Sequence, residues 1–188
     1  MFLDRDGVLV EDRGLVLQSE EFRILPGVPE ALRRLHRAGF LLVLVSNQAV
    51  VARGLLSEPE LLDLHAALER LLRAADAPPL DGFHYCPHHP AATLPAYRCE
   101  CPCRKPRPGL LLRAAEELGI DLAASFMVGD RPTDLLAGSR AGCRPVWVQS
   151  GRHGDPPIET GEALAVEVVA DFTGASLLEA ATWILEAQ

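Results

Sequence analysis

The sequence predicts an α/β fold, a doubly wound, Rossmann-like parallel sheet with helices on both faces. Short apolar runs alternate with amphipathic stretches along almost the whole chain, as strands and helices alternate in such sheets. Most of the runs are bounded by glycine, proline or polar residues, which is typical of buried parallel strands. Right-handed crossovers between successive parallel strands would then place helices on both faces.

Five apolar runs are predicted to be strands, and the stretches between them to be helices. A capping box of Ser57 and Glu60 marks the start of one helix, and Gly39 marks the end of another. The strands are predicted over residues 1–3, 40–45, 83–86, 125–128 and 145–149. The helices are predicted between residues 28 and 39, 57 and 72, 110 and 119, 134 and 142, and 176 and 185.

The composition indicates one globular domain over residues 1–188, with 48% apolar and 23% charged residues. The sequence has 18 basic and 26 acidic residues, a formal charge of −8, and such an acidic surface repels nucleic acid and anionic membranes. No apolar run approaches the ~20 residues of a membrane-spanning helix, and no signal peptide is recognisable. We therefore expect a monomeric, cytoplasmic protein whose partner is a small molecule.

Aspartates stand at the ends of two predicted strands. Asp4 and Asp6 leave the first strand on the same side, because side chains alternate along a strand, and Asp130 follows the fourth strand with Asp134 one helical turn later. Their mutual repulsion would cost several kcal/mol per close pair at an effective dielectric of ~20. A Mg²⁺ ion, which prefers a few carboxylates plus water and phosphate oxygens, removes this cost. The alternative is that Asp4 and Asp6 are turn residues and Asp130 a helix cap.

Hydrogen-bond donors and a positive charge accompany these acids. Ser46 and Asn47 follow the second predicted strand, and Lys105 lies in an Arg-Lys-Pro run. An aspartate that attacks phosphorus forms an aspartyl-phosphate, which divides one hard hydrolysis into two easier steps. Ser46 and Lys105 would stabilise the charge on the transferring group. Each residue alone is ambiguous, but the order acid pair, serine, lysine, acid pair indicates phosphoryl transfer.

These motifs resemble those of the haloacid dehalogenase (HAD) superfamily of phosphohydrolases over almost the whole chain. The run DRDGVL at residues 4–9 is similar to the first motif of that superfamily, Ser46 to the second, Lys105 to the third and residues 129–134 to the fourth. The resemblance implies a HAD-like fold, with Asp4 as nucleophile and Asp6 as general acid/base. An acid at the position of Asp6 is found in the phosphatases and mutases of the superfamily, which argues against its ATPases.

The same resemblance implies the ligands of the metal and of the phosphoryl group. Mg²⁺ would be held by Asp4, the backbone carbonyl of Asp6 and Asp130, with Asp134 supporting the metal shell. Ser46 and Lys105 would bind the transferring phosphoryl group.

No large cap domain fits between the motifs, because residues 46–82 are predicted to form a loop and one or two helices. We therefore expect an open pocket, shaped by residues 8–18 and by a loop rich in cysteine and histidine over residues 86–106.

This loop requires an organiser, because residues 87–106 show no periodicity and are long for a structureless connection. Four cysteines and two histidines fall between residues 86 and 103, a density that favours a structural, tetrahedral Zn²⁺. The binding free energy of zinc would fold the loop. The spacing leaves open which of Cys99, Cys101 and Cys103 bind, and whether His88 or His89 does. The alternative is a set of free thiols or a disulfide.

The pattern C-P-H-H-P … C-x-C-R-K-P in this loop resembles the D-glycero-D-manno-heptose 1,7-bisphosphate phosphatases, with histidinol-phosphate phosphatases as close kin. The resemblance implies that Cys99 is an extra, free thiol. The zinc ligands that it implies are Cys86, His88, Cys101 and Cys103.

The substrate is predicted from the same resemblance. The family motif reads roughly T/S-N-Q-S-G-I-x-R-G, and Ala49-Val50 replace its Ser-Gly, which removes a hydroxyl and a flexible glycine beside the expected substrate pocket. We expect removal of the 7-phosphate of the heptose bisphosphate, with histidinol phosphate or another sugar phosphate as the alternative. A receiver-like signalling domain is a distant alternative, since receivers carry the phosphorylated aspartate on a middle strand. The candidate substrate-binding residues are Asn47, Arg53, Arg104 and Arg131, although Arg53 could equally be a solvated residue.

Overall fold

The structure is a computed structural model that describes residues 1–151 and 169–187 of the chain. Six parallel strands form one sheet in the order β3-β2-β1-β4-β5-β6. This arrangement confirms the predicted doubly wound parallel sheet. The strands are β1 (Phe2–Leu3), β2 (Val43–Asn47), β3 (Gly82–Cys86), β4 (Phe126–Gly129), β5 (Arg144–Val148) and β6 (Phe172–Gly174).

The strand order reverses at β1, which pairs with β2 on one side and β4 on the other. In a doubly wound sheet, such a reversal opens a crevice at the carboxyl ends of the strands, where ligands bind. The predicted aspartates follow β1 and β4, the two strands that flank this crevice.

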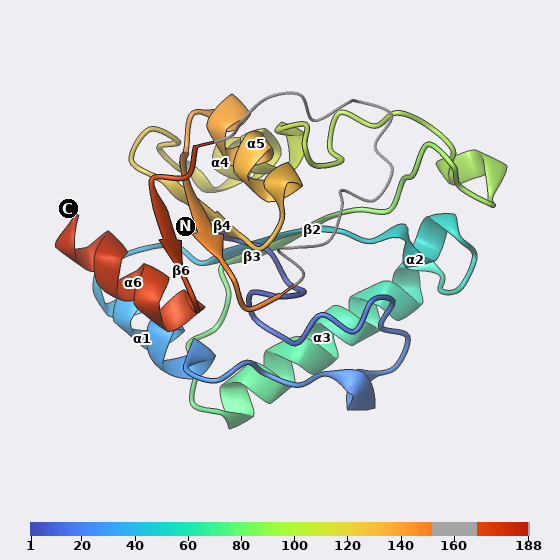
Figure 1. Ribbon diagram of the computed structural model, residues 1–188. Coiled ribbons are helices and arrows are strands. Elements are labelled where there is room, and N and C mark those ends of the chain that lie inside the picture. Colours follow the sequence, from blue (N-terminus) through green and yellow to red (C-terminus); the bar gives the residue numbers. More distant parts are fainter. Residues whose placement is uncertain (152–168, 188) are drawn as a thin grey trace.

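Two helical layers cover the sheet (Figure 1). Helices α1 (Val28–Arg37), α3 (Glu58–Ala74) and α6 (Leu177–Glu186) lie on one face, and α4 (Gly109–Leu118) and α5 (Pro132–Ala141) lie on the other. The remaining helical segments are short: η1 (Ser19–Glu21), α2 (Ala49–Ala52) and η2 (Pro95–Tyr97). Residues 46–82 therefore hold α2 and α3 and no cap-sized insertion, as predicted.

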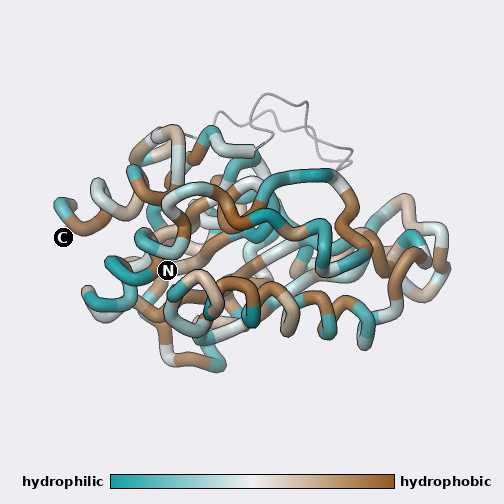
Figure 2. The backbone as a smooth tube through the Cα atoms, turned by 90° about the horizontal axis from the view of Figure 1, so that it is seen from below, coloured by the Kyte–Doolittle hydropathy of each residue, from teal (hydrophilic) through white to brown (hydrophobic). Residues whose placement is uncertain are grey.

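The strands fill both cores because their side chains alternate between the two faces. Leu44 of β2 packs in the larger core with α1, α3 and α6, whereas its neighbours Val43 and Val45 pack in the smaller core with α4 and α5. All three are fully buried. Figure 2 shows the resulting pattern, with hydrophobic segments along the sheet and alternating hydrophobic and hydrophilic residues along the helices.

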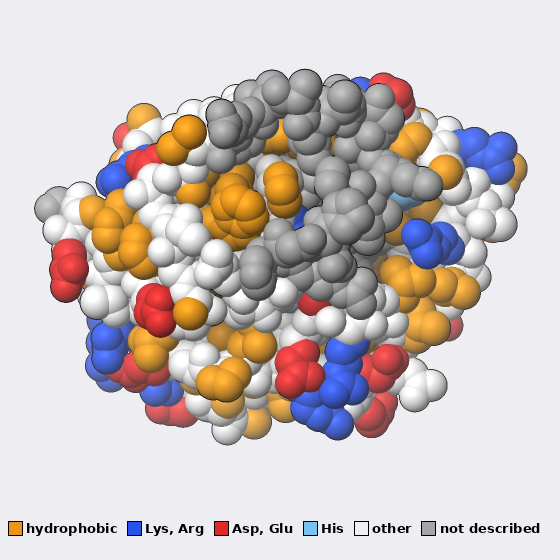
Figure 3. Space-filling view, in the orientation of Figure 1, with side chains coloured by type: hydrophobic (Ala, Val, Ile, Leu, Met, Phe, Trp, Pro, Cys, Tyr) orange, Lys and Arg blue, Asp and Glu red, His pale blue; other side chains and the backbone are white. Residues whose placement is uncertain are grey.

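Local signals set the helix boundaries. The main-chain N–H of Ser57 donates to Glu60 Oε2 at 2.7 Å, and the main-chain N–H of Glu60 donates to Ser57 Oγ at 3.4 Å. This is the predicted capping box, and it starts α3. No helix in the described part of the chain is long and apolar enough to cross a bilayer. Figure 3 shows acidic and basic side chains next to one another on one face of the molecule.

The sheet differs from the prediction at its strand ends, most of all at the strand predicted over residues 40–45, since β2 begins only at Val43, and in one added strand. Ser46 and Asn47 are the last two residues of β2 rather than residues that follow it, because β2 stays in register with β3 as far as the Asn47–Cys86 pair. Strand β6 was not predicted, since it has three residues and Thr173 in its middle is exposed. So short a segment carries no apolar run.

Candidate active site

Three buried aspartates meet at the carboxyl ends of β1 and β4. Asp4 follows β1, Asp130 follows β4, and Asp134 lies in the first turn of α5. One carboxylate oxygen of each lies within 4.8 Å of those of the other two. The exposed fractions of these residues are 7%, 0% and 1%. The acid cluster predicted from the sequence is therefore assembled in the crevice between the two strands.

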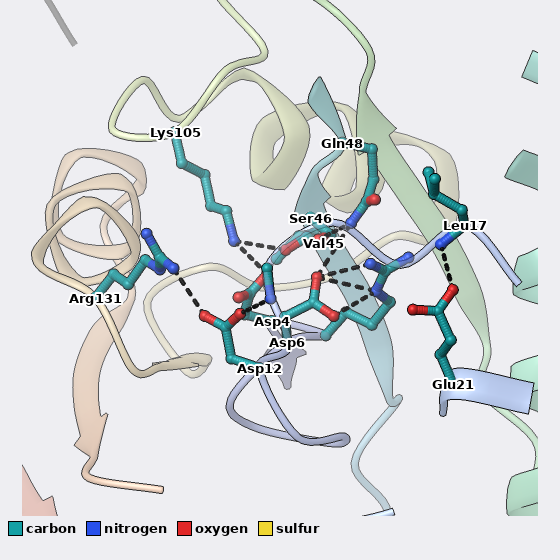
Figure 4. Close-up of polar contacts among 12 residues, drawn as sticks. Asp4, Asp6, Asp12, Leu17, Glu21, Val45, Ser46, Gln48, Lys105 and Arg131 are labelled. Atoms are coloured by element: carbon teal, nitrogen blue, oxygen red, sulfur yellow. Dashed lines mark hydrogen bonds and ion pairs between the residues drawn. The ribbon is translucent and has the colours of Figure 1, made fainter. Parts of the chain in front are cut away.

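Lys105 bridges two carboxylates of this cluster, those of Asp4 and Asp134, and Figure 4 shows its side chain reaching toward Asp4. Its Nζ is 2.7 Å from Asp4 Oδ1, 2.7 Å from Asp134 Oδ1 and 2.8 Å from the carbonyl oxygen of Val45. Burial alone would lower the pKa of Lys105, but Asp134 and Asp4 outweigh it, so the net effect is a raised pKa. The ammonium group therefore stays charged between the two carboxylates.

Asn47 fixes the main chain at Lys105. The Asn47 Oδ1 accepts a hydrogen bond from the Lys105 N–H at 3.0 Å, and the Asn47 Nδ2 donates to the Lys105 carbonyl at 3.0 Å. This pair of bonds joins the end of β2 to the loop before α4. For the second N–H of the Asn47 amide, the described residues supply no partner.

The acid cluster fits a divalent cation. Three buried carboxylates offer oxygen ligands within 4.8 Å of one another, and Lys105 pairs with two of them, Asp4 and Asp134. Hard cations such as Mg²⁺ prefer carboxylate oxygens as ligands. Burial, and then Asp4, raise the pKa of Asp134 to about 6 in the absence of a metal, although Lys105 lowers it. A cation at this site would favour the ionised form of all three acids.

The backbone around Asp130 is tightly packed. A Cβ atom placed on Gly7 or on Gly151 would collide with Asp130 Oδ2, and Gly7 has a left-handed φ of 80°. The Ser150 hydroxyl donates to the Gly7 carbonyl at 2.7 Å, which joins the loop after β5 to the turn after β1. Glycine at position 7 is therefore needed both for the turn and for space beside Asp130.

Asp6 lies beside the acid cluster and has different partners (Figure 4). Arg5 donates from its Nε to Asp6 Oδ1 at 3.0 Å and from a terminal nitrogen to Oδ2 at 2.8 Å. Gln48 Nε2 donates to the Ser46 hydroxyl at 2.8 Å and approaches Asp6 Oδ2 at 3.5 Å. Burial raises the pKa of Asp6 despite the opposing effect of Arg5.

The three candidate substrate arginines have different partners and exposure. The Arg131 guanidinium bonds Asp12 at 2.7 Å, which ties the segment after β1 to the start of α5. Arg104 donates to the carbonyl oxygen of His88 at 3.1 Å. Burial, and the nearby charge of Arg53, lower the pKa of Arg104. Arg53 itself is exposed at the end of α2.

The cysteine- and histidine-rich loop contains a second group of metal-ligand type. Cys86, His88 and Cys101 each have one ligand atom within 4.8 Å of those of the other two. The distance from Cys86 Sγ to His88 Nδ1 is 3.9 Å. Burial raises the pKa of Cys86 to about 12, and a bound metal would favour its thiolate form. Cys103 is not part of this group of three, although its N–H donates to Cys101 Sγ at 3.4 Å. Cys99 is exposed.

Sequence reasoning missed three residues of this site. Arg5, Asp12 and Gln48 each bond a predicted site residue. Arg5 and Gln48 stand within the first and second motifs, which was the available signal. Asp12 gave none, because its partner Arg131 lies 119 residues away.

A doubly wound sheet whose central strands end in a lysine-bridged cluster of aspartates defines a phosphohydrolase of the HAD class. In agreement, a family model described as HAD-hydrolase-like matches residues 102–175.

Comparison with known proteins gives the family. The D-glycero-beta-D-manno-heptose-1,7-bisphosphate 7-phosphatase of Photorhabdus laumondii is 42% identical over 175 residues, which are 92% of this chain and 92% of that protein. The protein of the same name from Escherichia coli K12 is 40% identical over 173 residues, covering 92% of this chain and 90% of the relative. The chain belongs to this family of HAD phosphatases, and it is a phosphatase.

The solved structures agree with this assignment. The D,D-heptose 1,7-bisphosphate phosphatase from B. bronchiseptica, complexed with magnesium and phosphate, superimposes with a TM-score of 0.82 at 32% identity, covering 100% of this chain and 98% of that one. The D,D-heptose 1,7-bisphosphate phosphatase from Burkholderia thailandensis superimposes with a TM-score of 0.67 at 26% identity, covering 98% of this chain and 96% of that one.

Proposed function

We propose that this phosphatase removes the 7-phosphate of D-glycero-D-manno-heptose 1,7-bisphosphate through an aspartyl-phosphate on Asp4. The observation that carries the chemistry is the position of Lys105, whose Nζ lies 2.7 Å from Asp4 Oδ1 inside the acid cluster. The names of the curated relatives support the choice of substrate.

In the proposed mechanism Asp4 attacks the phosphorus of the substrate, and the bond from phosphorus to the leaving oxygen breaks. The Ser46 hydroxyl and the Lys105 ammonium group stabilise the charge on the phosphoryl oxygens. Asp6 donates a proton to the leaving oxygen and then takes one from the water that attacks the aspartyl-phosphate. Its raised pKa favours a carboxylic acid that can donate this proton.

Mg²⁺ is the metal of this proposal, held by Asp4, Asp130 and the backbone carbonyl of Asp6, with Asp134 in support. When bound, it supplies positive charge that offsets the carboxylates and the phosphate. The 4.8 Å grouping of Asp4, Asp130 and Asp134 supports the assignment.

We further propose a structural Zn²⁺ held by Cys86, His88, Cys101 and Cys103. Three of these residues are already grouped. Cys103 follows two residues after Cys101 and donates its main-chain N–H to Cys101 Sγ at 3.4 Å, which supports it as the fourth ligand of a tetrahedral site. Zinc would also fix the approach of the substrate-binding residues, because Arg104 donates to the His88 carbonyl at 3.1 Å and Lys105 follows directly.

The arginines support a substrate with two phosphates. Arg104 and Arg53 are close enough for the charge of one to affect the other, and an anionic group between them would relieve this repulsion. Arg131 and the remaining N–H of Asn47 would orient the sugar. We propose that the enzyme is a monomer, in line with its net charge of −8. We also propose that it is cytoplasmic, because an odd number of cysteines, five, cannot all pair in disulfides within the chain.

The test is phosphate release from a panel of the heptose bisphosphate, histidinol phosphate, simple hexose phosphates and nucleotides, with identification of the remaining monophosphate. The proposal predicts the highest kcat/KM for the heptose bisphosphate and a heptose 1-phosphate product. Preference for histidinol phosphate, or release of the 1-phosphate, would overturn the substrate assignment without affecting the phosphatase class.

A further inference from the structure

Arg5, between Asp4 and Asp6 in the sequence, is a buried cation with no part in the mechanism above. Its exposed fraction is 1%. The guanidinium carbon lies 5.5 Å from the centroid of the Phe22 ring, so the aromatic side chain covers one face of the charge. A charge so far from water requires a defined function or a strong partner.

The partner is Asp6. Three bonds between 2.8 and 3.1 Å join the Arg5 nitrogens Nε and Nη2 to both oxygens of this carboxylate. A planar guanidinium fork fixes the plane of a carboxylate as well as its position, which a lysine cannot do. Among the described residues, Arg5 forms an ion pair with Asp6 and with no other acid.

The further side-chain contact that Asp6 makes among the described residues is weaker. Gln48 Nε2 approaches Asp6 Oδ2 at 3.5 Å and is itself committed to the Ser46 hydroxyl at 2.8 Å. The orientation of the Asp6 carboxylate therefore depends mainly on Arg5. A carboxylate offers about four lone-pair positions, so the fork leaves room for a proton in transfer.

We propose that Arg5 is the positioning residue that orients Asp6 toward the leaving-group oxygen. This inference rests on the proposed function, in which Asp6 carries the proton. As the bond between phosphorus and the leaving oxygen breaks, the proton of Asp6 moves to that oxygen, and a water proton replaces it in the second step. Arg5 exchanges no proton, and acts by holding the donor in place.

The inference predicts an effect that depends on the leaving group. A sugar alkoxide needs a proton in order to leave, whereas a nitrophenolate leaves without one. Because kcat/KM reports only the steps up to formation of the aspartyl-phosphate, loss of Arg5 should affect the two kinds of substrate differently. A defect in folding or in phosphate binding would affect them equally.

The experiment compares Arg5→Met, Arg5→Lys and Asp6→Asn with the unmodified enzyme on a sugar phosphate and on p-nitrophenyl phosphate. For Arg5→Met we expect kcat/KM to fall about 100-fold on the sugar phosphate and no more than about 3-fold on p-nitrophenyl phosphate, as for loss of a general acid. Arg5→Lys keeps the charge without the guanidinium fork. Its kcat/KM should also fall more on the sugar phosphate than on p-nitrophenyl phosphate, but by a smaller factor than in Arg5→Met. Adding Arg5→Met to Asp6→Asn should cause no further loss on the sugar phosphate.

An equal loss on both substrates, or no loss on either, would overturn the inference. If Arg5→Met does not fold, Arg5→Lys carries the test, because it retains the buried charge opposite Asp6. Two other outcomes would contradict the proposed function itself. One is an Asp4→Asn enzyme that still turns over substrate, and the other is an Asp6→Asn enzyme that loses kcat/KM equally on the sugar phosphate and on p-nitrophenyl phosphate. A selective Asp6→Asn beside a non-selective Arg5→Lys refutes the role of Arg5 alone.

Discussion

The Nζ of Lys105 lies 2.7 Å from Oδ1 of Asp4, a residue 101 positions earlier in the chain. Lys105 is the only lysine of the sequence, and its exposed fraction is 2%. Asp134 bonds the same ammonium group at 2.7 Å. One cation therefore joins the strand that carries the proposed nucleophile to the helix that supports the proposed metal.

Replacing Lys105 by methionine should reduce both activity and stability. We expect kcat to fall by at least about 100-fold, since a charge that stabilises the phosphoryl oxygens is lost. The free energy of unfolding without Mg²⁺ should fall by about 3 kcal/mol, because the carboxylates lose their buried partner. Saturating Mg²⁺ should raise the melting temperature of this variant more than that of the unmodified protein.

Arg73→Met is the control for the loss of a positive charge, because the Arg73 side chain is 70% exposed. It should leave activity and the response to Mg²⁺ unchanged. A Lys105→Met enzyme with full activity would contradict the site described above.

The cysteine loop allows a matched pair of substitutions. Cys101→Ser should abolish zinc binding and most activity, because a thiolate ligand is lost and the loop that carries Lys105 loses its organiser. Cys99→Ser, at an exposed position two residues away, should retain about one zinc per chain and full activity. Metal analysis of the purified variants, together with phosphate release, measures both. Loss of zinc from Cys99→Ser and not from Cys101→Ser would show that the ligands are assigned wrongly.

His65 should make the stability of the fold depend on pH. It lies buried against Phe83 and Tyr85, and burial, then the charge of Arg5, lowers its pKa from 6.5 to about 3. Below pH 6.5 the imidazole of His65 therefore binds a proton more readily in the unfolded chain than in the folded protein. The stability that comes from burying neutral His65 is complete above pH 6.5 and is lost as the pH falls toward 3. The expected slope is up to about 1.4 kcal/mol per pH unit.

Denaturant unfolding of His65→Leu between pH 7 and about pH 4.5 checks this dependence. The variant should lose less stability over the range than the unmodified protein, because it has no imidazole to protonate. His36→Leu, at an exposed position of α1, should behave like the unmodified protein. Equal slopes for all three proteins would contradict the prediction.

Local sequence was sufficient for most of the fold and for the acid cluster. Residues at the ends of apolar runs led to Asp4 and Asp130, because parallel strands bring their carboxyl ends to one edge. Long-range pairing was not predictable in this way. Nothing in the sequence near Arg131 indicates that it bonds Asp12, and the buried fork between Arg5 and Asp6 depends on Phe22 and the surrounding core. Such contacts are set by tertiary packing rather than by local spacing.

The most direct test of the account is detection of a phosphoryl group on Asp4. The Asp6→Asn variant would be mixed with p-nitrophenyl phosphate and Mg²⁺, because this substrate forms the intermediate without a general acid while hydrolysis of the intermediate stays slow. The mixture would be quenched in acid and digested for mass spectrometry. The account predicts a phosphorylated peptide with the modification on Asp4, which is absent when Asp4 is also replaced by asparagine. Turnover of substrate by an enzyme that never carries phosphate, or that carries it on another residue, would contradict the account.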